Sequence, residues 1–209
     1  FRWEQFFKFQ IIFIYFSVVN NPEISNNPTF FAAFHAVSAF CNGGFSTLSN
    51  SLYEESVRHN YFLQLTICWL IITGGLGYSV MINHYLLLKN KVKNKLTSLK
   101  VVPINTKVDF ARTSSNTRII LVTTAILLFV GTVLFFLAEY NGTLKEHSLF
   151  GKIVVSFFNS VTPRTAGFNN INMAEMGIPA FMLTMALMWI GASPGSTGGG
   201  IKTTTFAVA

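Results

Sequence analysis

Three stretches of the chain are long, apolar and free of charged side chains. Residues 59–88, 119–138 and 176–201 contain no Lys, Arg, Asp or Glu. A helix that spans a bilayer needs about 20 consecutive apolar residues, and each stretch is long enough. The pattern therefore predicts an all-α integral membrane protein with three spanning segments, two of them with residues to spare for a break or a tilt.

Two further apolar runs are too short to cross a bilayer. They cover residues 29–40 and 153–161, a length typical of re-entrant or interfacial helices. Each run leads into a glycine-bearing turn, CNGGFS at 41–46 and RTAGFN at 164–169. The opening apolar stretch, residues 6–19, is predicted to be the outer part of another helix.

The two halves of the chain repeat each other at an offset of 123 residues. The offset carries Gly44 onto Gly167 and Gly77 onto Gly200, so a glycine turn and a later glycine cluster recur in one register. The sequence thus predicts two repeated units, 1–88 and 119–209, joined by a loop at 89–118. The expected parts are re-entrant helices with their glycine turns at 29–46 and 151–169, and spanning helices at 59–88, 119–139 and 176–209, the last interrupted by glycines.

Composition and charge agree with a membrane location. The chain is 51% hydrophobic and 11% charged, whereas a soluble domain has about a quarter charged residues. Eight of the 15 basic residues lie in 89–118, where Asp109 is the sole acid. A Lys/Arg-rich loop between spanning segments marks the cytoplasmic side. This loop accounts for the net charge of +7 without a nucleic acid, so membrane lipid is the expected surroundings.

Backbone carbonyl oxygens are the expected ligands at the glycine turns. Glycine reaches backbone angles closed to other residues, and a turn of carbonyls can replace the hydration shell of K⁺, as in K⁺-channel filters. Neither 25–52 nor 151–174 contains an Asp or Glu. Such a site suits an alkali cation better than Ca²⁺ or Mg²⁺, which recruit carboxylates or keep waters. Transport needs no covalent chemistry, so neither enzyme activity nor a cofactor is expected.

Arg164 complicates this interpretation, because it lies three residues before Gly167. A guanidinium facing the path would repel cations, and would favour an anion pathway instead. We therefore expect Arg164 to point away from the path, held by backbone carbonyls or by a carboxylate such as Glu175.

The stretch GASPGSTGGGIKTTTF, residues 191–206, resembles a phosphate-binding loop. That motif needs glycine directly before lysine, whereas Ile201 separates Gly200 from Lys202 and no strand precedes it. So many small residues must break the helix at membrane depth, and breaks at matching places in two repeats indicate an ion pathway. We predict a mobile constriction or gate here. For the earlier glycines, Gly74, Gly75 and Gly77, close helix packing and function both remain open.

Four stretches of this sequence together resemble the Trk/Ktr/HKT superfamily of potassium transporters: FHAVSAFCNGGFSTLSNSL, GGLGY, NSVTPRTAGFNNINM and IGASPGSTGGGIKTTTFAV. The resemblance implies four repeats around one pore, of which this chain holds the second and most of the third. It implies ion-binding filter residues at Asn42, Gly43, Gly44, Thr165, Ala166 and Gly167, supported by Arg164, Phe45 and Phe168. The implied gate loop comprises Ser193, Gly195, Ser196, Thr197, Gly198, Gly199, Gly200 and Lys202.

The same resemblance implies potassium uptake across the bacterial inner membrane by a multi-pass homodimer. A separate cytoplasmic regulatory subunit of the TrkA/KtrA type would bind nucleotide. Cys41 and Gly43 depart from the family pattern, in which Asn and Ala are common. Because two repeats cannot close a ring, we expect no conduction by this chain alone. A sodium-selective or sodium-coupled transporter is the alternative within the family, and a membrane scaffold without an ion pathway is the alternative of another class.

Overall fold

The computed structural model describes residues 3–19, 24–25, 27–78, 80–83, 85 and 115–208. These residues form helices and turns without a strand, with one isolated bridge between Ile190 and Ile201. The predicted all-helical class is therefore confirmed. Most of the basic loop predicted at 89–118 lies outside the described residues.

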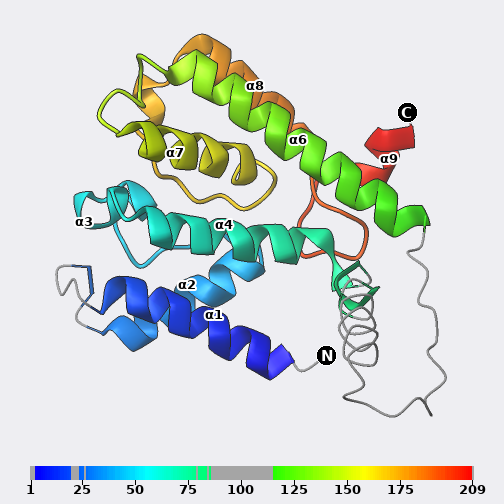
Figure 1. Ribbon diagram of the computed structural model, residues 1–209, viewed down its shortest axis with the longest axis horizontal. Helices are drawn as coiled ribbons and strands as arrows, with labels where there is room; N and C mark the ends of the chain where they lie inside the picture. Colours follow the sequence, from blue (N-terminus) through cyan, green and yellow to red (C-terminus); the bar gives the residue numbers. More distant parts are fainter. Residues whose placement is uncertain are drawn as a thin grey trace, which may run out of the picture.

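The first half begins with two helices, α1 (Trp3–Val18) and α2 (Pro28–Phe40). The side chain of Asn27 accepts a hydrogen bond from Phe30 N at 3.1 Å, and Pro28 occupies the first turn of α2, so the local sequence fixes where α2 starts. A short segment follows, consisting of η1 (Ser51–Tyr53) and α3 (Glu55–Arg58). Helix α4 (Tyr61–Leu76) then runs through the middle of the molecule (Figure 1).

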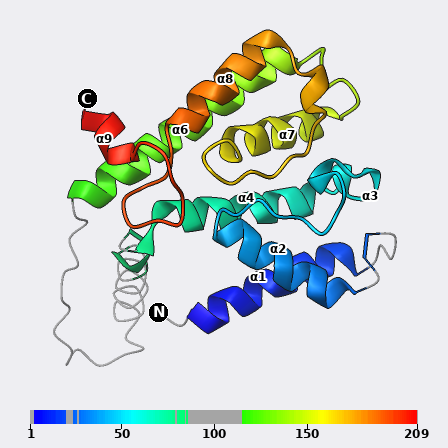
Figure 2. The same cartoon turned by 180° about the vertical axis from the view of Figure 1, so that it is seen from behind.

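The second half contains α6 (Ser115–Glu139) and α7 (Leu149–Val161). After η2 (Met173–Glu175), α8 (Ile178–Trp189) lies beside α6 in both views (Figures 1 and 2). The chain then loops back and ends in α9 (Thr203–Val208). Helix α7 lies between α4 and the pair α6 and α8, which places the two short helices α2 and α7 on either side of α4 (Figure 2).

Helix α6 is the described helix with the length and apolar composition to cross a membrane, over Asn116–Glu139. Its large apolar side chains are widely exposed, including Phe129 at 71%. The segments predicted to span at 59–88 and 176–209 are not continuous helices, because α4 ends at Leu76 and α8 at Trp189. Gly77, with φ at +84°, follows α4 directly, and this left-handed conformation ends the helix.

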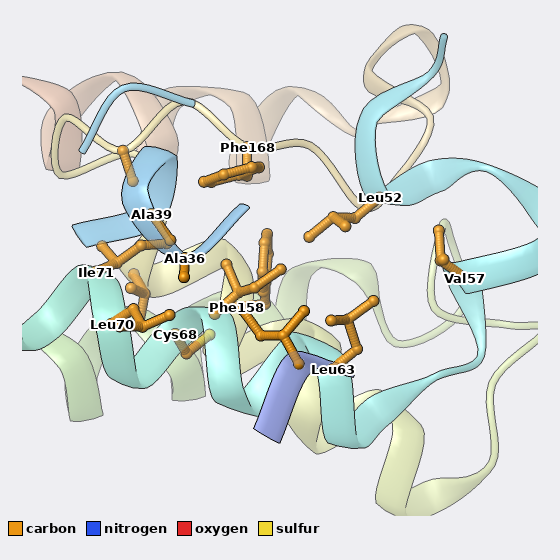
Figure 3. Close-up of a cluster of buried hydrophobic side chains, with 14 of the residues drawn as sticks. Ala36, Ala39, Leu52, Val57, Leu63, Cys68, Leu70, Ile71, Phe158 and Phe168 are labelled. Atoms are coloured by element: carbon orange, nitrogen blue, oxygen red, sulfur yellow. The ribbon is translucent and has the colours of Figure 1, made fainter. Parts of the chain in front are cut away.

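The main hydrophobic core draws side chains from both halves of the chain (Figure 3). Phe158 of α7 and Phe168 beyond it pack in one cluster with Leu63 and Leu70 of α4 and Ala36 of α2. Each is fully or almost fully buried, and such close packing is what holds helices together within a membrane. This core holds the ends of α2 and α7 at fixed positions against α4.

Candidate ion-coordinating site

The first glycine turn begins where α2 ends, at Phe40. Gly43 N donates to Ser38 O at 2.8 Å, and Ser38 Oγ donates to Phe45 O at 2.8 Å, so Ser38 holds both sides of the turn. Between these contacts, Asn42 and Gly44 have φ of +52° and +68°. Because two of the three residues 42–44 are left-handed, their successive carbonyls point in different directions.

The second glycine turn follows α7 and has the same backbone pattern. Thr165 and Gly167, at the positions equivalent to Asn42 and Gly44, have φ of +74° and +84°. Thr162 holds this turn, because its carbonyl accepts from Ala166 N at 3.0 Å and its Oγ1 donates to Phe168 O at 2.6 Å. The repeat of 123 residues is therefore a repeat of backbone conformation as well as of sequence.

The two turns touch each other through their backbones. A Cβ atom added to Gly44 would lie 2.4 Å from Ala166 O and 2.9 Å from Gly167 Cα. A Cβ atom added to Gly167 would lie 3.5 Å from Gly44 Cα. The structure thus places Gly44 of the first turn in contact with Ala166 and Gly167 of the second.

Helix dipoles give the neighbourhood of the turns a negative potential. Both α2 and α7 end at a turn, and a helix carries a partial negative charge at its carboxyl end. No Asp or Glu occurs in 25–52 or in 151–174. The oxygens that such a site can offer a cation are therefore those of the backbone and of uncharged side chains.

The three predicted support residues differ in position. Phe168 is buried and stacks on His35, with ring centroids 6.3 Å apart, whereas Phe45 is 71% exposed. His35 is itself buried and lies 3.0 Å from Ser46 Oγ through Nε2. It thus ties α2 to the segment that follows the first turn.

Arg164 is buried and lines a small cavity of about 20 Å³, together with residues of α4, α6 and α7 and with Ala192. The expected ion pair with Glu175 is not formed. Glu175 is exposed in η2, where Asn172 Nδ2 donates to it at 2.6 Å. The Arg164 Nε has no hydrogen-bond partner in the part of the chain that the structure describes.

The predicted gate loop lies in residues 190–202, between α8 and α9, and contacts the first half directly. Thr197 Oγ1 donates to Phe40 O at 3.1 Å, and Ser193 N donates to Gly75 O at 3.0 Å. Lys202 Nζ folds back onto Gly198 O at 2.9 Å. Gly200 has φ of +75°, close to the +84° of its equivalent Gly77.

Within this loop, Gly198 lies against side chains of both turns. A Cβ atom added there would lie 2.4 Å from Thr165 Oγ1 and 3.2 Å from Asn42 Nδ2. Asn42 Oδ1 and Thr165 Oγ1 are buried and make no hydrogen bond to the described residues. Ser193 is buried against Thr203, and Ser196 donates to Ser193 O, whereas Gly195 and Gly199 face open space.

Sequence reasoning missed a buried polar group beside the second turn, formed by Gln64, Asn159 and Asn170. Each of these amides interrupts or borders an apolar run. That interruption was the available signal, because a buried amide needs partners. It does not reveal which amides meet, since Gln64 and Asn170 are 106 residues apart.

Comparisons with known proteins cover nearly all of the chain. It is 39% identical over 194 residues to the potassium/sodium uptake protein NtpJ of Enterococcus hirae, covering 92% of this chain and 38% of that protein. It is 37% identical over 182 residues to the Ktr system potassium uptake protein B of Vibrio alginolyticus, covering 86% and 36%. The chain thus spans little more than a third of the length of these relatives.

The fold also matches a solved structure, that of the potassium transporter TrkH from Vibrio parahaemolyticus. The TM-score is 0.63 at 18% identity, and the match covers 94% of this chain and 36% of that one. Helices with exposed apolar side chains and one helix long enough to span a bilayer define a helical membrane protein. The profile of the family described as TrkH, cation transport protein, matches residues 6–209. The chain belongs to this family of membrane transporters.

Proposed function

We propose that the full-length protein takes up K⁺ across the bacterial inner membrane, and that the two touching turns form part of its selectivity filter. The observation that carries the proposal is the backbone contact between Gly44 and Gly167, because it brings carbonyl-rich turns from both halves to one place. Carbonyl dipoles at such a place can replace the hydration shell of an alkali cation. The names of the relatives support potassium as that cation.

The structural support for a filter is the pattern of four left-handed residues, two in each turn. Non-helical backbone persists at membrane depth where it is buried in protein or lines a water-filled path. Asn42 and Thr165 add buried side-chain oxygens without partners among the described residues, and these oxygens are available to a cation below the turns.

The loop at 190–202 is proposed to be the gate, within a spanning segment that its glycines interrupt. It is held against the first turn by the hydrogen bond from Thr197 to Phe40 O, so its release would change the path below both turns. Backbone hydrogen bonds from Ser193 N to Gly75 O, from Thr197 N to Gly74 O and from Tyr78 N to Gly195 O also hold the loop. Each contributes about 1 kcal/mol, so opening of the proposed gate has to break this set together.

The assembly around these turns is part of the same proposal. Four repeats within one full-length chain would close a ring that the two turns described here leave open. Two such multi-pass chains would form a homodimer. A cytoplasmic nucleotide-binding subunit of the TrkA/KtrA type would regulate it. Uptake of Na⁺ is the second candidate, favoured by the name of the Enterococcus hirae relative.

Substitution of Gly167 tests the filter. In the full-length protein, Gly167→Ser places a side chain at φ of +84°, a conformation that costs a non-glycine residue about 1–2 kcal/mol. We expect the preference for K⁺ over Na⁺ to fall roughly tenfold, measured as Rb⁺ and Na⁺ uptake in a strain without its own potassium uptake.

Gly195→Ser is the matched control for backbone strain. Gly195 has φ of +70° but lies in open space outside the turns, so its replacement should leave the ion preference unchanged. If Gly167→Ser also leaves the preference unchanged while the protein reaches the membrane, the filter assignment is wrong.

A further inference from the structure

A line of three buried side-chain amides joins the two halves of the chain beside the second turn. Gln64 comes from α4 and Asn159 from α7, and Asn170 lies three residues beyond Gly167. Their exposed fractions are 0%, 1% and 0%. Amides buried this completely are unfavourable unless they are hydrogen-bonded, so their partners decide what they do.

The amides bind one another in series. Gln64 Nε2 donates to the carbonyl of Arg58 at 2.8 Å, and Asn170 Nδ2 donates to Gln64 Oε1 at 3.0 Å. Asn159 Nδ2 then donates to Asn170 Oδ1 at 2.8 Å and to Val155 O at 2.9 Å. Asn170 is thus fixed from both sides, by α4 through Gln64 and by α7 through Asn159.

The backbone next to Asn170 has fixed contacts as well. Thr162 binds Phe168 O, and Leu52 N donates to Asn169 O at 2.8 Å. Among these contacts, the hydrogen bond from Asn170 to Gln64 ties the segment that follows the second turn to α4. Helix α4 therefore helps to fix the positions of the carbonyls around Gly167.

The first turn is held differently. The offset of 123 residues places Ala36 and Thr47 at the positions of Asn159 and Asn170, and Leu187 at the position of Gln64. There, His35 Nε2 lies 3.0 Å from Ser46 Oγ instead. The amide series belongs to the second turn alone, so the structure supports the two turns by different chemistry.

We propose that Gln64, acting through Asn170, is a positioning residue that sets the preference of the second turn for K⁺ over Na⁺. The inference rests on the proposed filter function. A coordinating site must be held within about 0.5 Å of its working geometry, and residues behind it supply that precision. Without Gln64 the segment after Gly167 loses its tie to α4, and its carbonyls can close around the smaller ion.

The test compares two substitutions in α4 of the full-length protein. Gln64→Met keeps the length of the side chain and removes both hydrogen-bonding groups. Thr66→Val is the control, because Thr66 is also buried in α4 but bonds only the carbonyl of Phe62 in its own helix. Competitive uptake of Rb⁺ and Na⁺ should show a roughly three- to tenfold loss of K⁺ preference in Gln64→Met and none in Thr66→Val.

The kinetic constants separate positioning from simple loss of protein. Positioning predicts a raised KM for Rb⁺ and a lowered KM for Na⁺, whereas fewer folded molecules would lower both maximal rates and leave the ratio intact. An intact ratio in Gln64→Met overturns the inference. Asn159→Leu breaks the series from α7 and should give the same loss, which keeps the test decisive if Gln64→Met does not accumulate.

The Gly167→Ser variant separates a wrong role for Gln64 from a wrong filter assignment. If Gly167→Ser changes the ion preference and Gln64→Met does not, only the role of Gln64 is wrong. If neither substitution changes it, the second turn is not the selective element and the proposed function fails with it.

Discussion

The glycines in and near the turns differ chiefly in how much space a Cβ atom would have. Gly44 has both a left-handed φ and the backbone of the other turn against it, so its replacement meets two obstacles. Gly167 has a φ of +84° and more room for a side chain, and Gly195 has a φ of +70° and open space around it. Three glycines that look alike in sequence therefore tolerate substitution to different degrees.

The loop glycines Gly198 and Gly199 give a matched pair for the gate. A Cβ atom at Gly198 would lie 2.4 Å from Thr165 Oγ1 and 2.5 Å from Ala192 Cβ, whereas one at Gly199 meets nothing within 4 Å. Overpacking of about 1 kcal/mol disfavours the described position of the loop, so Gly198→Ala should raise Rb⁺ uptake up to about fivefold.

Gly199→Ala adds the same methyl group without the collision and should transport at the rate of the unmodified protein. Both variants are compared at equal amounts in the membrane. A lowered or unaltered rate in Gly198→Ala would show that this contact does not hold the loop in an obstructing position.

Residue-level features were predictable where they depend on local backbone. The repeated glycines indicated both turns, because left-handed conformations favour glycine. Asn42 and Thr165 also adopt such conformations. Asn is enriched at positive φ, whereas the β-branched Thr165 is an exception that its residue type does not predict. The amide series could not be predicted from the sequence, because its members come together only through the packing of α4 against α7.

At the scale of elements, Glu139 joins the end of α6 to the start of α8. It is 1% exposed, and its Oε1 accepts from Gly177 N at 2.7 Å while Oε2 accepts from Thr143 N at 2.9 Å. A carboxylate at the amino end of a helix is also favoured by the helix dipole. One side chain thereby sets where the long helix α6 meets the shorter apolar helix α8.

Glu139→Gln should destabilise the full-length protein by about 1–3 kcal/mol, because one acceptor oxygen becomes an NH₂ group facing a buried donor. The measurement is the midpoint of thermal unfolding in detergent. Glu146→Gln is the control: Glu146 is 65% exposed in its ion pair with Arg58, and such pairs contribute at most about 1 kcal/mol. Equal shifts for the two variants would contradict the assigned role of Glu139.

The short helices were predicted well by apolar runs, because α2 (Pro28–Phe40) nearly coincides with residues 29–40. Helix α7 starts at Leu149, earlier than the run at 153–161, since Ser148 accepts from Gly151 N and caps it. The breaks after α4 and α8 were harder to place. Apolar composition continues through them, and the break depends on single glycine torsions and on contacts of residues 190–202.

At the scale of the whole molecule, the two halves also meet at the outer ends of their helices. Arg58 of α3 pairs with Glu146, and Tyr61 Oη lies 3.1 Å from His147 Nδ1. His147 is 5% exposed, and its ring lies 5.1 Å from that of His59. His147 itself lies in the connection between α6 and α7, outside the membrane-spanning segments, whereas Tyr61 is the first residue of α4.

The pKa of His147 is lowered from 6.5 to about 4, chiefly by burial and also by the charges of His59, Arg58 and Lys152, which together outweigh the opposite effect of Glu146. The folded protein thus binds this proton less readily than the unfolded chain. The stabilisation is complete above pH 6.5 and is lost as the pH falls towards 4, by about 2 kcal/mol at pH 5.

Thermal unfolding of the full-length protein at pH 7.5 and pH 5 measures this contribution. His147→Phe keeps an aromatic ring and should show a smaller loss of stability on acidification than the unmodified protein. Lys145→Gln, at an exposed neighbouring position, should keep the original pH dependence. If His147→Phe loses as much stability at pH 5 as the unmodified protein, other groups cause that loss.

The backbone contact between Gly44 and Ala166 also constrains how the protein is made. The first turn is completed by a neighbour that lies more than 120 positions later in the chain. At a synthesis rate of about 5–20 residues per second, its partner leaves the ribosome roughly 6 to 25 seconds afterwards. During that interval the nascent turn must wait in the membrane with its carbonyls covered by water, lipid headgroups or an insertion factor.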